Sequence, residues 1–310
     1  MVGVILAGYG GPSSLDDVEP FLASIAGGRK FTPEQIEAVR ARYRLIGGKS
    51  PLNEITVRQA EALQARLNGN GIRYTVRVGM LHLPPRIPDA AAGIITDGVR
   101  KIAVVTLAPF RSRASTAAYF NEAAKALQAY GDAEAVYVSG WNRNPNFIGA
   151  AAAGINGVIE SFPEEERGDV DVIFSIHSVP ESHIRDGDSY VGDINDTVEA
   201  IVPRLRGNRH HIAYQSKGRG EGWLGPDTET IMKKLSGEKR TRIVIAPIGF
   251  ISDHVETLYD IDITLYKLAR ELGVTMKRVP ALNDSPLFIS ALAEETKKAT
   301  AHWFDGGLNK

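Results

Sequence analysis

The sequence of 310 residues contains no cysteine. Disulfides, zinc sites built from thiolates and iron–sulfur clusters held by cysteine are therefore excluded. The chemistry of the chain must therefore be free of thiols. We accordingly expect no iron–sulfur cluster.

A surplus of positive charge is also missing, because 36 Lys and Arg residues face 37 Asp and Glu residues, for a net charge of -1. Nucleic acids and anionic membranes attract strongly basic surfaces, so neither is expected as the main partner. No window approaches eighteen uninterrupted apolar residues, so we expect no membrane span. The opening stretch MVGVILAGYGG is too short for a signal core and lacks a charged leader. We therefore expect a cytoplasmic protein.

Short apolar runs rich in β-branched residues alternate with segments of helical periodicity. This alternation is typical of an α/β protein, in which helices cover parallel sheets. A hydrophobic content of 43% suits a folded chain, and the length suits about two domains. The expected strands are 3–7, 74–79, 102–107, 133–139, 170–176, 210–214, 242–247 and 274–279.

The two halves of the chain share a strand count without sharing a sequence repeat, which predicts two similar open sheets. We expect a first lobe over 1–141 and a second over 142–284. A final helix, at about 285–310, is expected to pack back on the first lobe. Ligands of such sheets bind beyond the carboxyl ends of the strands, or in a cleft between lobes.

Capping chemistry marks the starts of the helices between the first two strands. Thr32, Pro33 and Gln35 fit a capping box, and Ser14 with Asp17 approximates one. Three helical segments, at 14–26, 33–43 and 53–67, are more than one crossover needs. In the loop RYRLIGGKSP after the second of them, the side chains that could face a ligand are Arg42, Tyr43 and Ser50.

A histidine stands where a buried strand ends: His177 follows the run 170–176 and precedes Pro180. Tyr9 holds a similar place after the first strand. A histidine at a strand end can be a hydrogen-bonded core residue, or it can act on a ligand at the carboxyl edge of the sheet. The sequence alone leaves both interpretations open.

Acidic residues recur in the segment FISDHVETLYDID. On an α-helix capped by Ser252 or Asp253, the positions of Asp253, Glu256 and Asp260 (i, i+3 and i+7) share one face. They could be solvated partners of the helix dipole. Alternatively, their repulsion could be offset by iron(II) or magnesium, or the row could carry protons.

The sequence contains several other features that resemble sites. The short glycine motifs GYGGP and GRGEG lack the pattern of a nucleotide loop. His210 and His211 are adjacent on a strand and cannot serve one metal. Arg111 and Arg113 could bind a carboxylate or face water. Trp223 is more readily interpreted as the anchor of its glycine-rich loop than as a stacking surface.

Taken together, the motifs GYGGP, RYRLIGGKSP, IHSVP, YQSKGRGEGWLGPDTE, PIGFISDHVETLYDID and LNDSPLFISALA resemble the ferrochelatase family over nearly the whole chain. The resemblance implies two Rossmann-like lobes, each with a four-stranded parallel sheet, and a porphyrin cleft between them. It implies a lyase of haem biosynthesis that inserts Fe2+ into a porphyrin and releases two protons. His177 and Glu256 match the pair proposed to bind iron and take up pyrrole protons.

The resemblance also assigns surrounding residues. Asp260 matches a ridge of acids, to which Asp253 is added. Thr264 stands where some relatives carry a further ridge carboxylate, and Asp262 could substitute only on an irregular helix. An arginine of some short bacterial forms falls on Ala26, so propionates would need Arg29, Arg111 or Arg113. Positions matching the porphyrin lining are Tyr9, Arg42, Tyr43, Ser50, His82 and Tyr119.

The substrates implied are Fe2+ and either protoporphyrin IX or coproporphyrin III, with no prosthetic group. We expect a monomer that passes haem to a transient acceptor. The side from which iron enters, that of Tyr9 or that of His177, stays open. Two alternatives remain at this point: a cobalt or nickel chelatase of tetrapyrroles, and a non-catalytic haem or metal delivery protein.

Overall fold

The computed structural model describes residues 1–68, 71–218 and 222–304. The chain divides into two compact units: Met1–Trp141 together with the segment that starts at Asn283, and Asn142–Leu282. Parts of two predicted elements, 219–221 of the glycine-rich loop and 305–310 of the last helix, lie outside the described residues.

The first unit is built on a four-stranded parallel sheet in the order β2-β1-β3-β4. All seven residues of β1 are buried, because this strand has neighbours on both sides and helices on both faces. The strands are β1 (Val2–Gly8), β2 (Tyr74–Met80), β3 (Lys101–Thr106) and β4 (Glu134–Val138).

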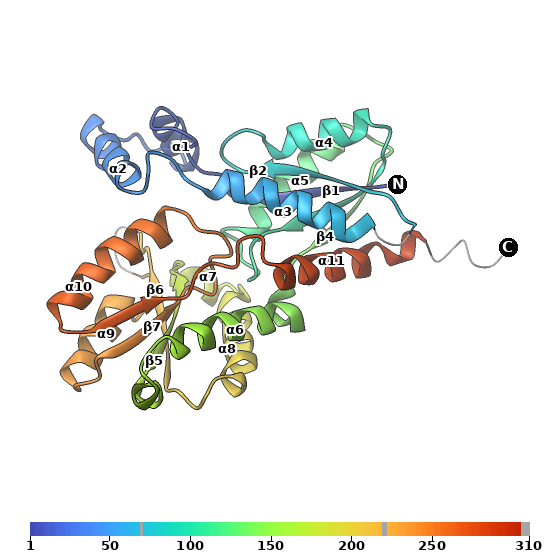
Figure 1. Cartoon of the computed structure of the whole chain (residues 1–310). Helices are drawn as coiled ribbons and strands as arrows, with labels where there is room; N and C mark the ends of the chain where they lie inside the picture. The colour runs from blue at the N-terminus through green and yellow to red at the C-terminus, as the bar shows by residue number, and fades with distance from the viewer. Residues whose placement is uncertain (69–70, 219–221, 305–310) are drawn as a thin grey trace. The chain divides into compact units, whose positions relative to one another are not determined.

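Helices cover both faces of this sheet (Figure 1). Two of them, α4 and α5, share a buried apolar cluster with β1 and β3. On the other face α11 packs against α3, β3 and β4, although it comes from the far end of the sequence. The helices are α1 (Val18–Ile25), α2 (Pro33–Leu45), α3 (Leu52–Leu67), α4 (Ile87–Thr96), α5 (Thr116–Gln128) and α11 (Pro286–Thr300).

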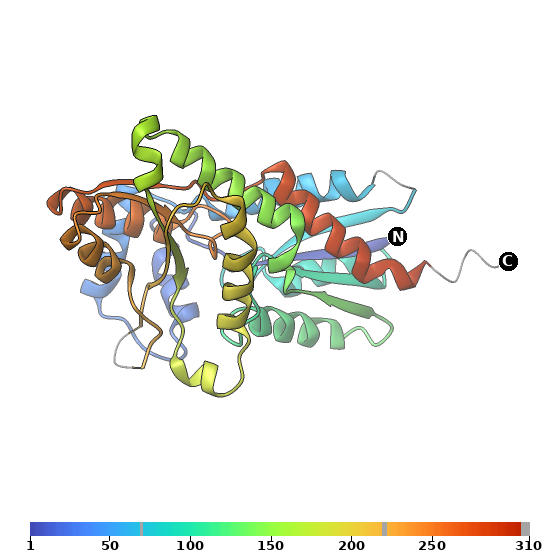
Figure 2. The ribbon, with the colours of Figure 1, turned by 90° about the horizontal axis from the view of Figure 1, so that it is seen from below.

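The second unit repeats this plan with the order β6-β5-β7-β8, again parallel. Its strands are β5 (Asp171–His177), β6 (His210–Gln215), β7 (Arg242–Ala246) and β8 (Thr275–Arg278). Helices α6 and α8 pack together, as Figure 2 shows, while α9 and α10 share an apolar cluster with the sheet. The helices are α6 (Pro145–Glu160), α7 (Glu181–Arg185), α8 (Tyr190–Ile201), α9 (Thr228–Gly237), a π-helix (Glu256–Leu265) and α10 (Tyr266–Glu271).

The predicted α/β class and all eight predicted strands are confirmed, each strand to within one residue at either end. The capping box of α2 is confirmed as well: Thr32 Oγ1 accepts from Gln35 N, and Gln35 Oε1 accepts from Thr32 N. Within the described ranges, no helix has the length and apolar character needed to cross a membrane.

The predicted start of the first helix is wrong. Ser14 and Asp17 do not cap a helix at 14, because Asp17 Oδ2 accepts from Ser13 N and Ser14 Oγ and folds this stretch into turns. The helix begins at Val18 instead.

Candidate active site

His177 is the last residue of β5 and stands at the carboxyl edge of its sheet. Its Nδ1 lies 2.6 Å from the carbonyl oxygen of Ser178. A carbonyl can only accept a hydrogen bond, so Nδ1 carries the proton and Nε2 of the neutral ring keeps its lone pair. The strand therefore presents an imidazole whose Nε2 can take up a proton or bind a metal.

The backbone of this histidine is held by Tyr190 of α8, whose hydroxyl donates to His177 O at 3.0 Å. Burial raises the pKa of the Tyr190 hydroxyl, and the charges of Tyr214 and Glu256 raise it further. Tyr190 thus remains a protonated donor throughout the physiological range. Tyr190 therefore holds the backbone of His177 in place at the edge of the sheet.

Glu256, at the start of the π-helix, is the charged neighbour of His177. Its Oε2 lies 3.9 Å from His177 Nε2, and the two side chains are 26% and 41% exposed respectively. The separation exceeds a hydrogen bond, so Nε2 is not bonded to the carboxylate, and the carboxylate would stabilise an imidazolium at this position. The structure thus brings together the two residues that the sequence predicted as a catalytic and iron-binding pair.

A third residue, which the sequence did not single out, orients this carboxylate. Ser216 Oγ donates to Glu256 Oε2 at 2.8 Å. The backbone of Ser216 has φ of 57°, in the left-handed region that only few non-glycine residues adopt. The sequence signal that could have identified Ser216 is its position, directly after β6 and ahead of a glycine-rich stretch.

We expect removal of the Ser216 hydroxyl to lower the rate of iron insertion about fivefold, the equivalent of ~1 kcal/mol for one hydrogen bond. Steady-state turnover of Ser216→Ala and Ser216→Gly measures this. Glycine fits the left-handed backbone, so the glycine variant should melt no lower than the wild type. Full turnover in Ser216→Gly would show that the hydroxyl does not matter.

The acidic residues of the segment FISDHVETLYDID are arranged differently from the predicted row on an α-helix. The segment is a π-helix from Glu256, with hydrogen bonds from i to i+5, so α-helical spacing does not apply, and Asp253 precedes the helix. Its carboxylate accepts from Arg278 Nη1 at 3.0 Å. The predicted row is therefore wrong for Asp253, which does not belong to the helix, whereas Glu256 and Asp260 both lie on it, four residues apart.

The resemblance concerned three positions on this helix: Asp260, Asp262 and Thr264. The helix is irregular, as a role for Asp262 required, but both Asp262 oxygens bind Arg278. Thr264 is exposed, and Asp260 is half-buried four residues after Glu256. Burial acts to lower the pKa of the Arg278 guanidinium, but its bonds to Asp262 and the charge of Asp253 outweigh this and raise that pKa. An arginine thus offsets part of the repulsion for which a divalent cation was considered.

Over the described part of the chain, no group of three or more His, Cys, Asp or Glu side chains is placed to hold a metal ion. His177 and Glu256 alone would leave most of the coordination sphere of a cation to water or to another ligand. Such a pair is better suited to a metal ion that is bound transiently than to one that is bound permanently.

In the first unit the structure brings Tyr9 and His82 together, with ring centroids 4.4 Å apart. Tyr9 is 40% exposed and directly follows β1. His82 Nδ1 lies 2.9 Å from Ser24 Oγ, and Phe21 packs edge-on against both rings. Burial, with a contribution from Arg86, lowers the pKa of His82 to about 4. His82 is therefore neutral at pH 7.

This shift predicts a contribution to stability that depends on pH. The unfolded chain binds the proton of His82 below a pKa of about 6.5, whereas the folded chain binds it only below about 4. Stability from this group is thus complete above pH 6.5 and is lost as pH falls from 6.5 toward 4. The melting temperature of His82→Gln should fall less over this window than that of the wild type; parallel curves would contradict the shift.

The remaining residues predicted to line a porphyrin are mostly buried: Tyr43, Ser50 and Tyr119 are 2%, 3% and 4% exposed. Ser50 Oγ accepts from Leu52 N at the start of α3, and burial raises the pKa of Tyr119. Arg42 is exposed. For all four, contact with a porphyrin stays a prediction.

The ferrochelatase family model matches residues 1–300. The chain belongs to the ferrochelatase family. It is 38% identical over 304 residues to a ferrochelatase of Deinococcus radiodurans, covering 97% of this chain and 96% of that one. It is 36% identical over 304 residues to a coproporphyrin III ferrochelatase of Geobacillus thermodenitrificans, covering 97% and 96%.

A solved structure of SirB from Bacillus subtilis with Fe3+ has a similar fold, with a TM-score of 0.64 at 12% identity, covering 99% of this chain and 98% of that one. This likeness concerns the fold alone. The family assignment confirms the activity implied by the motifs: the chain is a ferrochelatase, a lyase of haem biosynthesis that inserts Fe2+ into a porphyrin. Its substrates are a porphyrin and iron.

Other candidate features of this ferrochelatase have structural roles. Trp223 pairs with Pro180 and its ring leaves no room for a side chain at Gly218, so it anchors the loop as expected. His211 Nε2 lies 2.8 Å from buried Asp171, at the opposite end of β5 from His177. Both Arg111 and Arg113 are exposed.

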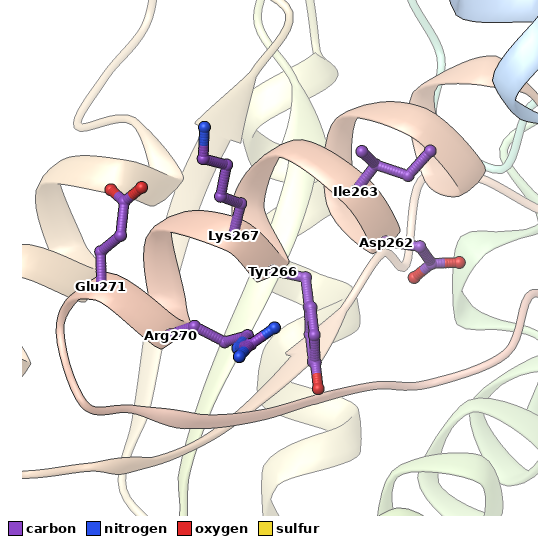
Figure 3. A pocket seen from close by; sticks show the side chains of 6 residues that line it. All are labelled: Asp262, Ile263, Tyr266, Lys267, Arg270 and Glu271. Atoms are coloured by element: carbon purple, nitrogen blue, oxygen red, sulfur yellow. The ribbon is translucent and has the colours of Figure 1, made fainter.

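A hollow of about 530 Å³ lies along the π-helix and α10, outside the His177–Glu256 pair. Figure 3 shows that its side chains leave the helix in different directions, with Lys267 on one side and Tyr266 on the other. Asp262, also in its lining, is already bound to Arg278. The hollow therefore offers no convergent set of groups for the chemistry of a ferrochelatase.

Proposed function

We propose that His177 accepts the pyrrole protons of the porphyrin and that His177 and Glu256 together receive the iron. The observation that carries this proposal is the commitment of Nδ1 to the Ser178 carbonyl, which leaves the lone pair of Nε2 beside the Glu256 carboxylate at 3.9 Å. A neutral imidazole, with a reference pKa of about 6.5, is suited to accept protons near neutral pH.

The balance of protons and charge in the reaction determines what these residues must do. Two N–H protons leave the ring as one Fe2+ ion enters, so the charge at the centre of the ring is unchanged. His177 accepts one proton at a time, and Glu256 stabilises the imidazolium that forms. Both side chains are partly exposed, which gives each proton a route to water.

Iron is a substrate in this proposal, and the chain carries no prosthetic group. One imidazole and one carboxylate suit partly hydrated iron(II) and hold it less firmly than a complete set of protein ligands. The lack of cysteine supports this, because a thiolate would bind iron strongly and slow its release into the ring. Asp260, further along the π-helix, is proposed to accept protons from the pair.

The contribution of the first unit is proposed to come from Tyr9 and His82. Tyr9 is exposed and packs edge-to-face against a histidine that is neutral at pH 7. A neutral aromatic surface suits the flat face of a porphyrin better than a charged one does. Arg42, Tyr43, Ser50 and Tyr119 are proposed as further lining.

We further propose a cytoplasmic monomer that hands haem to a transient acceptor. The near balance of acidic and basic residues supports a chain without a lasting attachment to nucleic acid or anionic lipid. Light scattering of the purified chain with and without porphyrin tests the monomer; a stable dimer would contradict it.

The experiment for the function supplies Fe2+ without oxygen, offers protoporphyrin IX and coproporphyrin III in turn, and follows the Soret band. An enzyme converts many equivalents of porphyrin per chain, whereas a delivery protein saturates at one. The preferred porphyrin is the one with the higher kcat/KM. Saturation at one equivalent with both porphyrins would overturn the proposal.

A further inference from the structure

The guanidinium of Arg278 contacts the segment that carries Glu256 at two points. Arg278, the last residue of β8, has a side chain that is only 13% exposed. Its Nε and Nη2 donate to the two oxygens of Asp262 at 2.7 and 2.8 Å. Its Nη1 donates to Asp253 Oδ1 at 3.0 Å. One guanidinium thus engages two carboxylates through three hydrogen bonds.

The two carboxylates lie on either side of Glu256 along the chain. Asp253 precedes it by three residues and Asp262 follows it by six. Asp253 also accepts from Thr257 Oγ1 at 3.2 Å, and Thr257 is completely buried. Arg278 therefore joins the approach to the π-helix and its middle to one fixed point at the end of β8.

A π-helix is rare and holds its residues in a different angular order from an α-helix. If the segment changed to hydrogen bonds from i to i+4, Glu256 would turn relative to Asp262. The distance between Glu256 and His177 depends on this register, because His177 sits on a different element, β5. A tie on both sides of Glu256 resists such a change.

We propose that Arg278 is a positioning residue for iron insertion, which clamps Asp253 and Asp262 so that the π-helix presents Glu256 to His177. This inference rests on the proposed function of that pair. Arginine suits the task because its planar fork can satisfy one carboxylate with two bonds and reach a second one. Lysine keeps the positive charge but lacks the planar, forked group. The Arg278→Lys variant therefore tests the effect of geometry separately from the effect of charge.

The test is a double-mutant cycle that combines Arg278→Lys with Glu256→Gln, read as kcat and as the KM for porphyrin. Misplaced catalytic groups lose about 10-fold to 100-fold in rate. We expect Arg278→Lys to lower kcat by about 10-fold with little change in KM, and to have less than about twofold effect in the Glu256→Gln background. Such non-additivity is the signature of action through Glu256.

Arg240→Lys is the matched control. Arg240 binds the buried carboxylate of Asp171 at the far end of β5, so its replacement should lower the melting temperature without changing kcat by more than about twofold. A purely structural role for Arg278 would resemble this control.

The outcomes are separable. A kcat of Arg278→Lys near that of the wild type, or an equal loss in both backgrounds, overturns the clamp while the pair itself stands. Full activity of Glu256→Gln overturns the proposed function and the clamp with it. If Arg278→Lys does not fold, Asp262→Asn takes its place in the same cycle, because the amide keeps one acceptor oxygen but loses the other and the negative charge, while Asp253 stays paired; the same criteria then apply.

Discussion

Replacing His177 by alanine should lower iron insertion by about 10²-fold to 10⁴-fold, the usual contribution of a general base. Porphyrin affinity should change little, because the imidazole acts on the centre of the ring and supplies little of the contact area. Initial rates from the Soret band give the first quantity, and fluorescence titration with porphyrin in the absence of iron gives the second.

His210→Ala is the control for this variant. His210 begins the neighbouring strand β6, is exposed, and pairs in register with Val172 at the far end of β5. It should retain wild-type turnover. Near-normal turnover in His177→Ala, or a parallel loss in His210→Ala, would defeat the assignment.

Glu256→Gln should reduce the rate about as steeply, by about 10²-fold, because the isosteric amide cannot stabilise an imidazolium or bind iron(II) well. The Ser216 hydroxyl, which now donates to Glu256 Oε2, can donate equally to the amide oxygen, so the local fold should persist. Turnover and melting temperature measured on one preparation check both parts.

The stability of this variant decides between two roles for the glutamate. A melting temperature within a few degrees of the wild type, together with the loss of rate, places Glu256 in the chemistry. A collapse of the melting temperature would instead make it a structural acid that holds the loop after β6.

The sheets could be predicted because their signals are local. Most strands contain a short apolar run that contrasts with its neighbours, and β1 and β5 are buried along almost their whole length. The position of His177 followed from the same run, since it marks where the strand ends. The pairing with Glu256 came from the resemblance of the motifs, because no spacing along the chain connects β5 with a helix almost eighty residues later.

The π-helix and its clamp could not be predicted for a physical reason. Local spacing suggested an α-helix, whereas the register that formed is accompanied by bonds from Arg278, which lies 25 residues after Asp253. The role of Ser216 could not be predicted for a similar reason, because its contact with Glu256 spans 40 residues. Contacts at such separations depend on the tertiary fold and leave no periodic trace in the sequence.

The placement of Asp253 in the acidic row was wrong for the same reason, because its partner Arg278 is distant in the sequence. A divalent cation that offsets the repulsion, and the transfer of protons along the row, both stay predictions. The compensating charge for Asp253 and Asp262 is a guanidinium of the chain itself. Glu256 lies outside this pairing, which leaves its carboxylate to act with His177.

Chemical rescue tests the central claim most directly. In His177→Gly, free imidazole added to the enzyme, porphyrin and Fe2+ can occupy the vacated space and act as the missing base. We expect insertion to rise with imidazole concentration to a plateau, and the same addition not to raise the turnover of Glu256→Gln. Insertion by His177→Gly that ignores imidazole while porphyrin still binds would contradict it.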